Sequence, residues 1–216
     1  MRRIADSFSW PFKGRWPSKW LIGSLAVLLL PIAFIPLLGY AIAATRAGIQ
    51  SEGEGPPPWS LSTRLITDGF WTAFAVALLS APFALAESPL ASTINKAHLW
   101  RVSDANLSQI YGHIAALYLL ALPLGLLLLM LLPHATRRFA ESGKPTDLFN
   151  FPQSIRDVKN DFATWNVAAA AIVTGWTVGL ACAGLACVGL LPGVFYAILV
   201  SAHACAALGP KTKAPA

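Results

Sequence analysis

Residues 20–45 read WLIGSLAVLLLPIAFIPLLGYAIAAT, a run without a charged side chain. An apolar helix of about 20 residues crosses the hydrocarbon core of a bilayer, so the run is long enough to span. Pro31 and Pro36 lie in its middle, and each removes a hydrogen bond from a helix. Two half-helices of about 12 residues would each rise only about 18 Å, too little to cross. Pro31, Pro36 and Gly39 therefore predict a helix break and favour a re-entrant hairpin.

The rest of the chain contains further charge-free runs, and together these predict an all-α integral membrane bundle. We expect four full transmembrane helices besides the broken first segment. An amphipathic cytoplasmic helix is expected between residues 149 and 165, where apolar residues recur at helical spacing. A single membrane domain covers residues 1–209, and residues 210–216 form a short cytoplasmic tail. The predicted hydrophobic segments are about 20–45, 65–86, 109–132, 163–185 and 190–208.

The composition excludes several classes of protein. Of 216 residues, 56% are hydrophobic and 12% are charged, against about 25% charged in a soluble domain. A disordered chain, a nucleic-acid-binding module and most soluble enzymes are thereby excluded. The net charge is +6, but the basic residues stand at the ends of apolar runs, where they orient helices and meet anionic lipid headgroups. The lipid bilayer, not nucleic acid, is the expected partner.

The distribution of Lys and Arg predicts the topology. If the first segment spans, 7 of these residues lie inside and 9 outside; if it re-enters, 14 lie inside and 2 outside. The positive-inside rule favours the second arrangement. Both termini are then cytoplasmic, residues 87–108 form the outward loop, and the protein resides in the inner or plasma membrane.

Candidate chemistry is sparse. Nothing in the sequence resembles a nucleophile–base pair, a phosphate-binding loop, paired carboxylates or a metal cluster, so we expect neither an enzyme nor a metal site. Asp68 is expected to pair with Arg64 one helical turn away, with a proton relay as the alternative. His203 and His113 lie inside predicted spans and are candidate ligands of a tetrapyrrole. The alternative for each is a hydrogen bond to a neighbouring helix.

Small residues mark one helix face. Gly175, Gly179 and Ala183 recur every fourth residue, a spacing that permits close packing of two helices. The sequence leaves open whether the second helix belongs to this chain or to a partner. Cys182 and Cys187 are expected to be buried small hydrophobes, with a disulfide as the alternative.

Several short motifs carry a resemblance to a known family. In chain order they are Pro11-Phe12-Lys13-Gly14, Trp16-Pro-Ser-Lys19-Trp-Leu-Ile-Gly23, Pro31, Pro36, Gly39-Tyr40, Arg46, Gly48, Pro58-Trp59, Asp68-Gly69, residues 139–151 and Pro192-Gly193-Val-Phe195-Tyr196. The chain resembles the membrane family called domain of unknown function 4013. The resemblance implies a bacterial or archaeal multi-pass membrane protein without an established activity, and it carries no catalytic residue over to this chain.

These observations favour a non-enzymatic membrane protein, an accessory or assembly subunit that packs against other transmembrane subunits or against copies of itself. One alternative is a small-solute transporter or channel, in which Ser24, Tyr40 and Asp68 would be the polar residues along the path. The other is a pigment- or haem-binding subunit, in which a tetrapyrrole would be ligated by His203 or His113.

Overall fold

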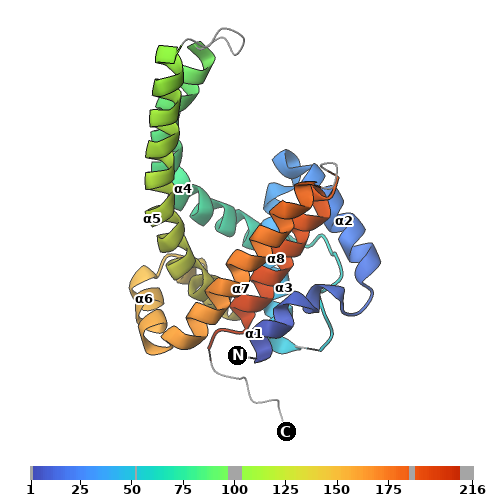
Figure 1. Ribbon diagram of the computed structural model, residues 1–216. Coiled ribbons are helices and arrows are strands. Elements are labelled where there is room, and N and C mark those ends of the chain that lie inside the picture. The colour runs from blue at the N-terminus through green and yellow to red at the C-terminus, as the bar shows by residue number, and fades with distance from the viewer. Residues whose placement is uncertain (1, 52, 97–103, 185–187, 210–216) are drawn as a thin grey trace. The chain divides into compact units, whose positions relative to one another are not determined.

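The computed structural model describes residues 2–51, 53–96, 104–184 and 188–209, and it is all-helical over these ranges, with no strand in them (Figure 1). The predicted all-α class is confirmed. Contacts divide the chain into two compact units, one formed by residues 1–75 and 130–216 and the other by residues 76–129. We describe each unit separately and refer to them as the first and the second unit.

The helices follow one another along the chain, and the longest stretch between two of them runs from residue 51 to residue 62. Four of them are 3-10 turns, written η1 to η4. The elements are α1 (Arg2–Ala5), η1 (Asp6–Phe8), η2 (Trp10–Phe12), α2 (Trp16–Leu28), α3 (Leu30–Gln50), α4 (Thr63–Lys96), α5 (Asp104–Ser142), η3 (Pro145–Leu148), α6 (Phe151–Asn160), α7 (Phe162–Ala181), η4 (Cys182–Gly184) and α8 (Leu190–Ala206).

Four helices of the described part are long and apolar enough to cross a membrane. α8 is equally apolar but has 17 residues, about one turn fewer than a perpendicular span needs. The predicted segment 190–208 therefore corresponds to an apolar helix that is shorter than the four candidate spans. The four candidate spans are Leu30–Gln50, Thr63–Leu85, Ile110–Ser142 and Phe162–Gly184.

The break in the first hydrophobic segment lies earlier than the prolines suggested. α2 ends at Leu28 and α3 begins at Leu30, so Pro31 stands in the first turn of the new helix. A proline is well tolerated there, because the backbone N–H it lacks would have had no intrahelical partner. Pro36 and Gly39 lie inside α3 and do not end it. The expected division into two equal halves is therefore wrong: α2 has 13 residues and α3 has 21.

The two ends of this broken segment return to each other. The Lys19 ammonium at the start of α2 donates to the carbonyl of Pro56 beyond α3, and the Trp59 indole donates to the Lys19 carbonyl at 3.2 Å. Burial lowers the pKa of Lys19 below its ordinary value. Gly55, with φ of 78°, packs on the backbone of Lys13. α2 and α3 thus form a helical hairpin that is closed by contacts at its open end.

Glycines allow the helices of the first unit to cross at backbone distance. A Cβ added to Gly179 of α7 would lie 2.3 Å from the carbonyl oxygen of Gly193 in α8, and Gly193 meets Gly179 in the same way. A Cβ on Gly39 of α3 would lie 2.0 Å from the Leu65 carbonyl oxygen in α4. Gly39 therefore serves a helix crossing, and the helix-break role expected for it is wrong. α7 and α8 run side by side in Figure 1.

The predicted amphipathic segment is divided into two helices. α6 buries Ser154 and Val158, but of the apolar residues that suggested the amphipathic helix, Ile155 and Phe162 are exposed. The chain then leaves helical geometry at Asp161, whose carboxylate accepts a hydrogen bond from the Thr164 amide and caps α7. A capping side chain of this kind begins a new helix, because it satisfies an N–H that has no partner within the helix.

The second unit contains most of α4 and the first two thirds of α5. Both helices extend past the predicted segment ends, to Lys96 and from Asp104, so they take up most of the expected outward loop. Two shallow grooves run between α4 and α5, each of about 200 Å³ or slightly less. Their walls are apolar apart from Ser80 and the hydroxyl of Tyr118.

Candidate functional site

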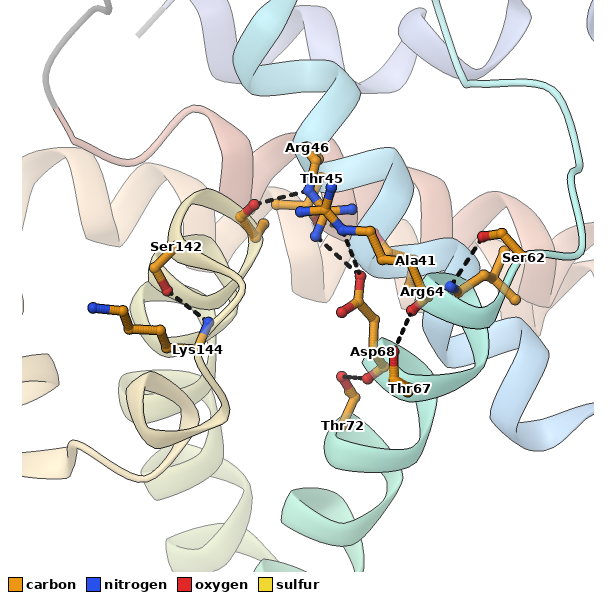
Figure 2. A network of polar contacts seen from close by, with 12 residues as sticks. Ala41, Thr45, Arg46, Ser62, Arg64, Thr67, Asp68, Thr72, Ser142 and Lys144 are labelled. Carbon is orange, nitrogen blue, oxygen red and sulfur yellow. Dashed lines mark hydrogen bonds and ion pairs between the residues drawn. The ribbon is translucent and has the colours of Figure 1, made fainter.

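A half-buried arginine joins three helices in the first unit. Arg46 of α3 donates to Asp68 of α4 at 3.0 Å and to the backbone oxygen of Ala140 in α5 at 3.0 Å. Arg64 also approaches Asp68, at 3.9 Å, one helical turn away (Figure 2). Asp68 is only 6% exposed. Because a buried carboxylate is costly unless it is paired, the group acts as a fixed polar joint between α3, α4 and α5.

Sequence reasoning found half of this joint. The predicted pair of Arg64 and Asp68 is present, but it is the longer of the two contacts. Arg46 was missed as a partner because it lies 22 residues away, and only the crossing of α3 and α4 at Gly39 brings the two helices together. The sequence feature that could have indicated a pairing role for Arg46 is its position directly after the apolar run of residues 20–45.

A second group of polar side chains surrounds a pocket of about 440 Å³, which we name the polar pocket. It lies where α5 ends, beside α6 and the residues that follow α8. Its lining combines two guanidiniums, one imidazole and three carboxylates. The lining residues are His134, Arg137, Arg138, Glu141, Gln153, Asp157, Asn160, Asp161 and Gly209.

The two arginines of the polar pocket have different partners. Arg137 donates to the Glu141 carboxylate at 2.8 and 3.0 Å and to the Ala206 carbonyl at 3.0 Å. Arg138 forms an ion pair with Asp157 and also donates to the Ser154 hydroxyl at 2.8 Å. The arginines thus tie the end of α5 to α6 and α8.

His203, a predicted tetrapyrrole ligand, is enclosed by the N-terminal segment. Its Nδ1 lies 2.8 Å from the Ser7 hydroxyl, its ring lies 4.9 Å from the ring of Trp10, and it is 2% exposed. A tetrapyrrole could reach the ring only by displacing these neighbours. The contacts are those of the alternative, a histidine that binds a neighbouring segment of the chain.

The other predicted site residues are dispersed. The side chains of His113 and of Cys187 lie outside the described residues. The Tyr40 hydroxyl donates to the Pro57 carbonyl at 2.8 Å, and its ring stacks on Trp59 at 3.9 Å. Tyr40 thus holds the loop after α3. Over the described ranges, no three His, Cys, Asp or Glu side chains are grouped so that they could hold a metal ion.

The glycine face of α7 is used inside the chain. Gly175 packs on Val200 and Gly179 on Gly193, both in α8. Ala183 lies beyond the end of α7, in η4, and is half-buried. Of the two uses that the sequence left open, the structure shows the internal contact.

The comparisons with known proteins give a family. A family model described as Protein of unknown function (DUF4013) matches residues 22–188. No curated protein and no solved structure was found to match the chain. The match contains the Arg46–Asp68 joint and most of the polar pocket, whereas the motifs Pro11-Phe12-Lys13-Gly14 and Pro192-Gly193 lie outside it. Since it covers well over half of the residues, the chain belongs to the DUF4013 family of proteins of unknown function.

Proposed function

We propose that the protein is a non-enzymatic accessory subunit whose α4–α5 hairpin packs against transmembrane helices of another protein. The observation that carries this proposal is the small burial of α5. In its most apolar window only 6% of the residues are buried, against 39% in α3. The first unit uses its glycine faces internally, and the helix with the smallest buried share among the candidate spans is α5. The exposed stripe on this helix, which we name the α5 stripe, consists of Tyr118, Leu119, Leu122 and Leu126.

Tyr118 favours a protein over lipid as the cover of the α5 stripe. Tyr118 lies about 12 Å along the helix from the start of the candidate span at Ile110. It is 68% exposed, and its hydroxyl has no hydrogen-bond partner among the described residues. Tyrosines that face lipid concentrate near the interface, where water satisfies the hydroxyl. A polar group deeper in the membrane is stabilised by an acceptor on a neighbouring helix.

The test compares two exposed surfaces of equal chemistry. The full chain is extracted from its native membranes in mild detergent and sized on a native gel, as wild type and as the double variant L122A/L126A. The matched control is V173A/L180A, which removes similar apolar volume from an exposed face of α7. We expect a large stoichiometric complex that the α5 variant loses and the α7 control retains.

Two results would contradict the proposal. One is a wild-type species at the mass of this chain alone or a small multiple of it. The other is a complex that the α5 variant and the α7 control leave equally intact.

We also propose that α2 and α3 re-enter the membrane. Three contacts support this: the hairpin closes at its open end through Lys19 and Pro56, Arg3 donates to the Gly48 carbonyl near the end of α3, and Arg46 donates to Ala140 near the end of α5. Single cysteines at Ser9, Ser51 and Ser142 should label from the cytoplasmic side, and one at Ser92 from the outside. Labelling of S51C from the outside would contradict re-entry.

A further inference from the structure

The two grooves between α4 and α5 repeat along α5 at a fixed interval. On the α5 side, four residues line each groove, and they stand at positions i, i+3, i+4 and i+7 of the helix. These residues are Ile114, Leu117, Tyr118 and Ala121 in one groove, and Ala121, Leu124, Gly125 and Leu128 in the other. The second set is the first moved by seven residues, or about 10 Å along the axis. We name them the Tyr118 groove and the Gly125 groove.

This arrangement matches the holes of knobs-into-holes packing. In such packing a side chain of one helix inserts among four residues of its neighbour, and the holes follow each other every heptad. Transmembrane helices commonly pack with the crossing angle of coiled coils. The α4 helix does not fill the holes, since a Cβ added to Gly125 would meet nothing within 4 Å. Each groove, of about 200 Å³ or slightly less, has room for one large apolar side chain.

Each groove also contains one hydroxyl in an otherwise apolar wall. Ser80 of α4 lines the Gly125 groove, and Tyr118 lines the other. Neither hydroxyl forms a hydrogen bond within the described part of the chain. A lipid acyl chain would fill the apolar space but has no acceptor for them. A helix offers backbone carbonyls with a second lone pair and polar side chains as acceptors, so the two hydroxyls favour a helix as the occupant.

We propose that the two grooves receive two large apolar side chains, seven residues apart, from one helix of the partner subunit. This inference rests on the proposed function and adds to it the seam in which the partner helix lies and the sequence pattern that this helix carries. Gly125 lets the helix approach α5 closely. Tyr118 both lines a groove and belongs to the α5 stripe, so the partner helix and the stripe meet at this residue.

A matched pair of glycine variants tests the seam. G125L fills its groove from within and should abolish the native complex on the gel. The control is G112L, because a Cβ on Gly112 also meets nothing within 4 Å, Gly112 lines neither groove, and it stands about 140° around α5 from Gly125. Leucine is the better helix former in both places. Both purified variants should therefore unfold at or above the wild-type temperature, and G112L should keep the complex.

A defined probe tests the heptad spacing without the native partner. The full chain is reconstituted in phosphatidylglycerol–phosphatidylethanolamine vesicles with lysine-flanked transmembrane peptides of alanine and leucine, and association is measured by fluorescence energy transfer. In the heptad peptide the leucines follow the a and d positions, and in the scattered peptide the same leucines are spread around the helix. We expect about tenfold tighter association of the heptad peptide, and G125L but not G112L should remove this preference.

The outcomes separate this inference from the proposed function. Equal association of the two peptides, or a heptad preference that survives G125L, overturns the inference. A native complex that G125L retains and L122A/L126A loses also overturns it, while the proposed function stands. If the wild-type chain runs alone on the native gel but prefers the heptad peptide through Gly125, the grooves do receive such a helix, and only the proposed stable complex is contradicted.

Discussion

The apolar helices of this protein differ in how far they are covered by other helices of the chain. In the first unit, α3 crosses α4, and α7 crosses α8, at glycines that bring backbone against backbone, and charged groups such as Arg46 and Asp68 are paired within the chain. In the second unit, Leu119 on α5 is 74% exposed, and glycines such as Gly125 meet nothing within 4 Å. The first unit thus pairs several of its helices with one another, whereas the two helices of the second unit leave large apolar side chains of α5 uncovered within that unit.

The largest expected effect is at the polar joint of the first unit. D68N leaves the half-buried Arg46 guanidinium without its counter-charge, which should destabilise the protein by about 3 kcal/mol. Thermal unfolding in detergent measures the loss. The control is D6N, an exposed carboxylate, and it should unfold like the wild type. Equal stability of D68N and D6N would show that the joint is not structural.

A pair of glycine variants compares the two units directly. G193A places a methyl group within 2.2 Å of the Gly179 carbonyl oxygen, so α7 and α8 must separate, at a cost of about 2 kcal/mol. G125A places the same methyl group in open space on α5 and improves helix propensity, so it should be neutral or slightly stabilising. If both variants unfold at one temperature, the close crossing of α7 and α8 is contradicted.

Leucine truncations extend the comparison to side-chain packing. L199A removes a fully buried side chain from the cluster around Trp10 and Phe195, and we expect a loss of about 2 kcal/mol. L122A removes a side chain that is 64% exposed and should leave the stability of the isolated chain unchanged. Unfolding along a concentration gradient of a denaturing detergent measures the stability of both variants. A loss in L122A as large as in L199A would mean that α5 is buried within its own chain.

The smallest effect concerns two tyrosine hydroxyls. Y40F loses the hydrogen bond to the Pro57 carbonyl and should cost about 1 kcal/mol. Y118F loses a hydroxyl that has no partner in the described chain, so the isolated protein should not change, although its complex with a partner should weaken. Thermal unfolding of the two purified variants, side by side, checks the first expectation. A stability loss in Y118F without one in Y40F would mean that the Tyr118 hydroxyl, and not the Tyr40 hydroxyl, has its hydrogen-bond partner within the chain.

Local patterns predicted the helices well, and long-range pairings poorly. The apolar run of residues 20–45 and the amphipathic pattern of residues 149–165 each gave helices near the expected places. The exact breaks at Leu29 and Asp161 depended on single residues, a first-turn proline and a capping carboxylate. Arg46 could not be matched to Asp68, nor His134 to α6, because a single sequence carries no signal for which helix ends meet in space. The spacing of Gly175 and Gly179 predicted close packing but not the helix on the other side.

The most direct test of the account is a photo-cross-linking residue placed at Leu122 of the α5 stripe in native membranes, with the same residue at Val173 of α7 as the reference. If a partner protein covers α5, position 122 gives a discrete cross-linked band, and Y118F reduces the yield of that band. Position 173 then gives only lipid adducts. Lipid adducts alone from both positions would contradict the claim that the α4–α5 hairpin is the surface for a partner subunit.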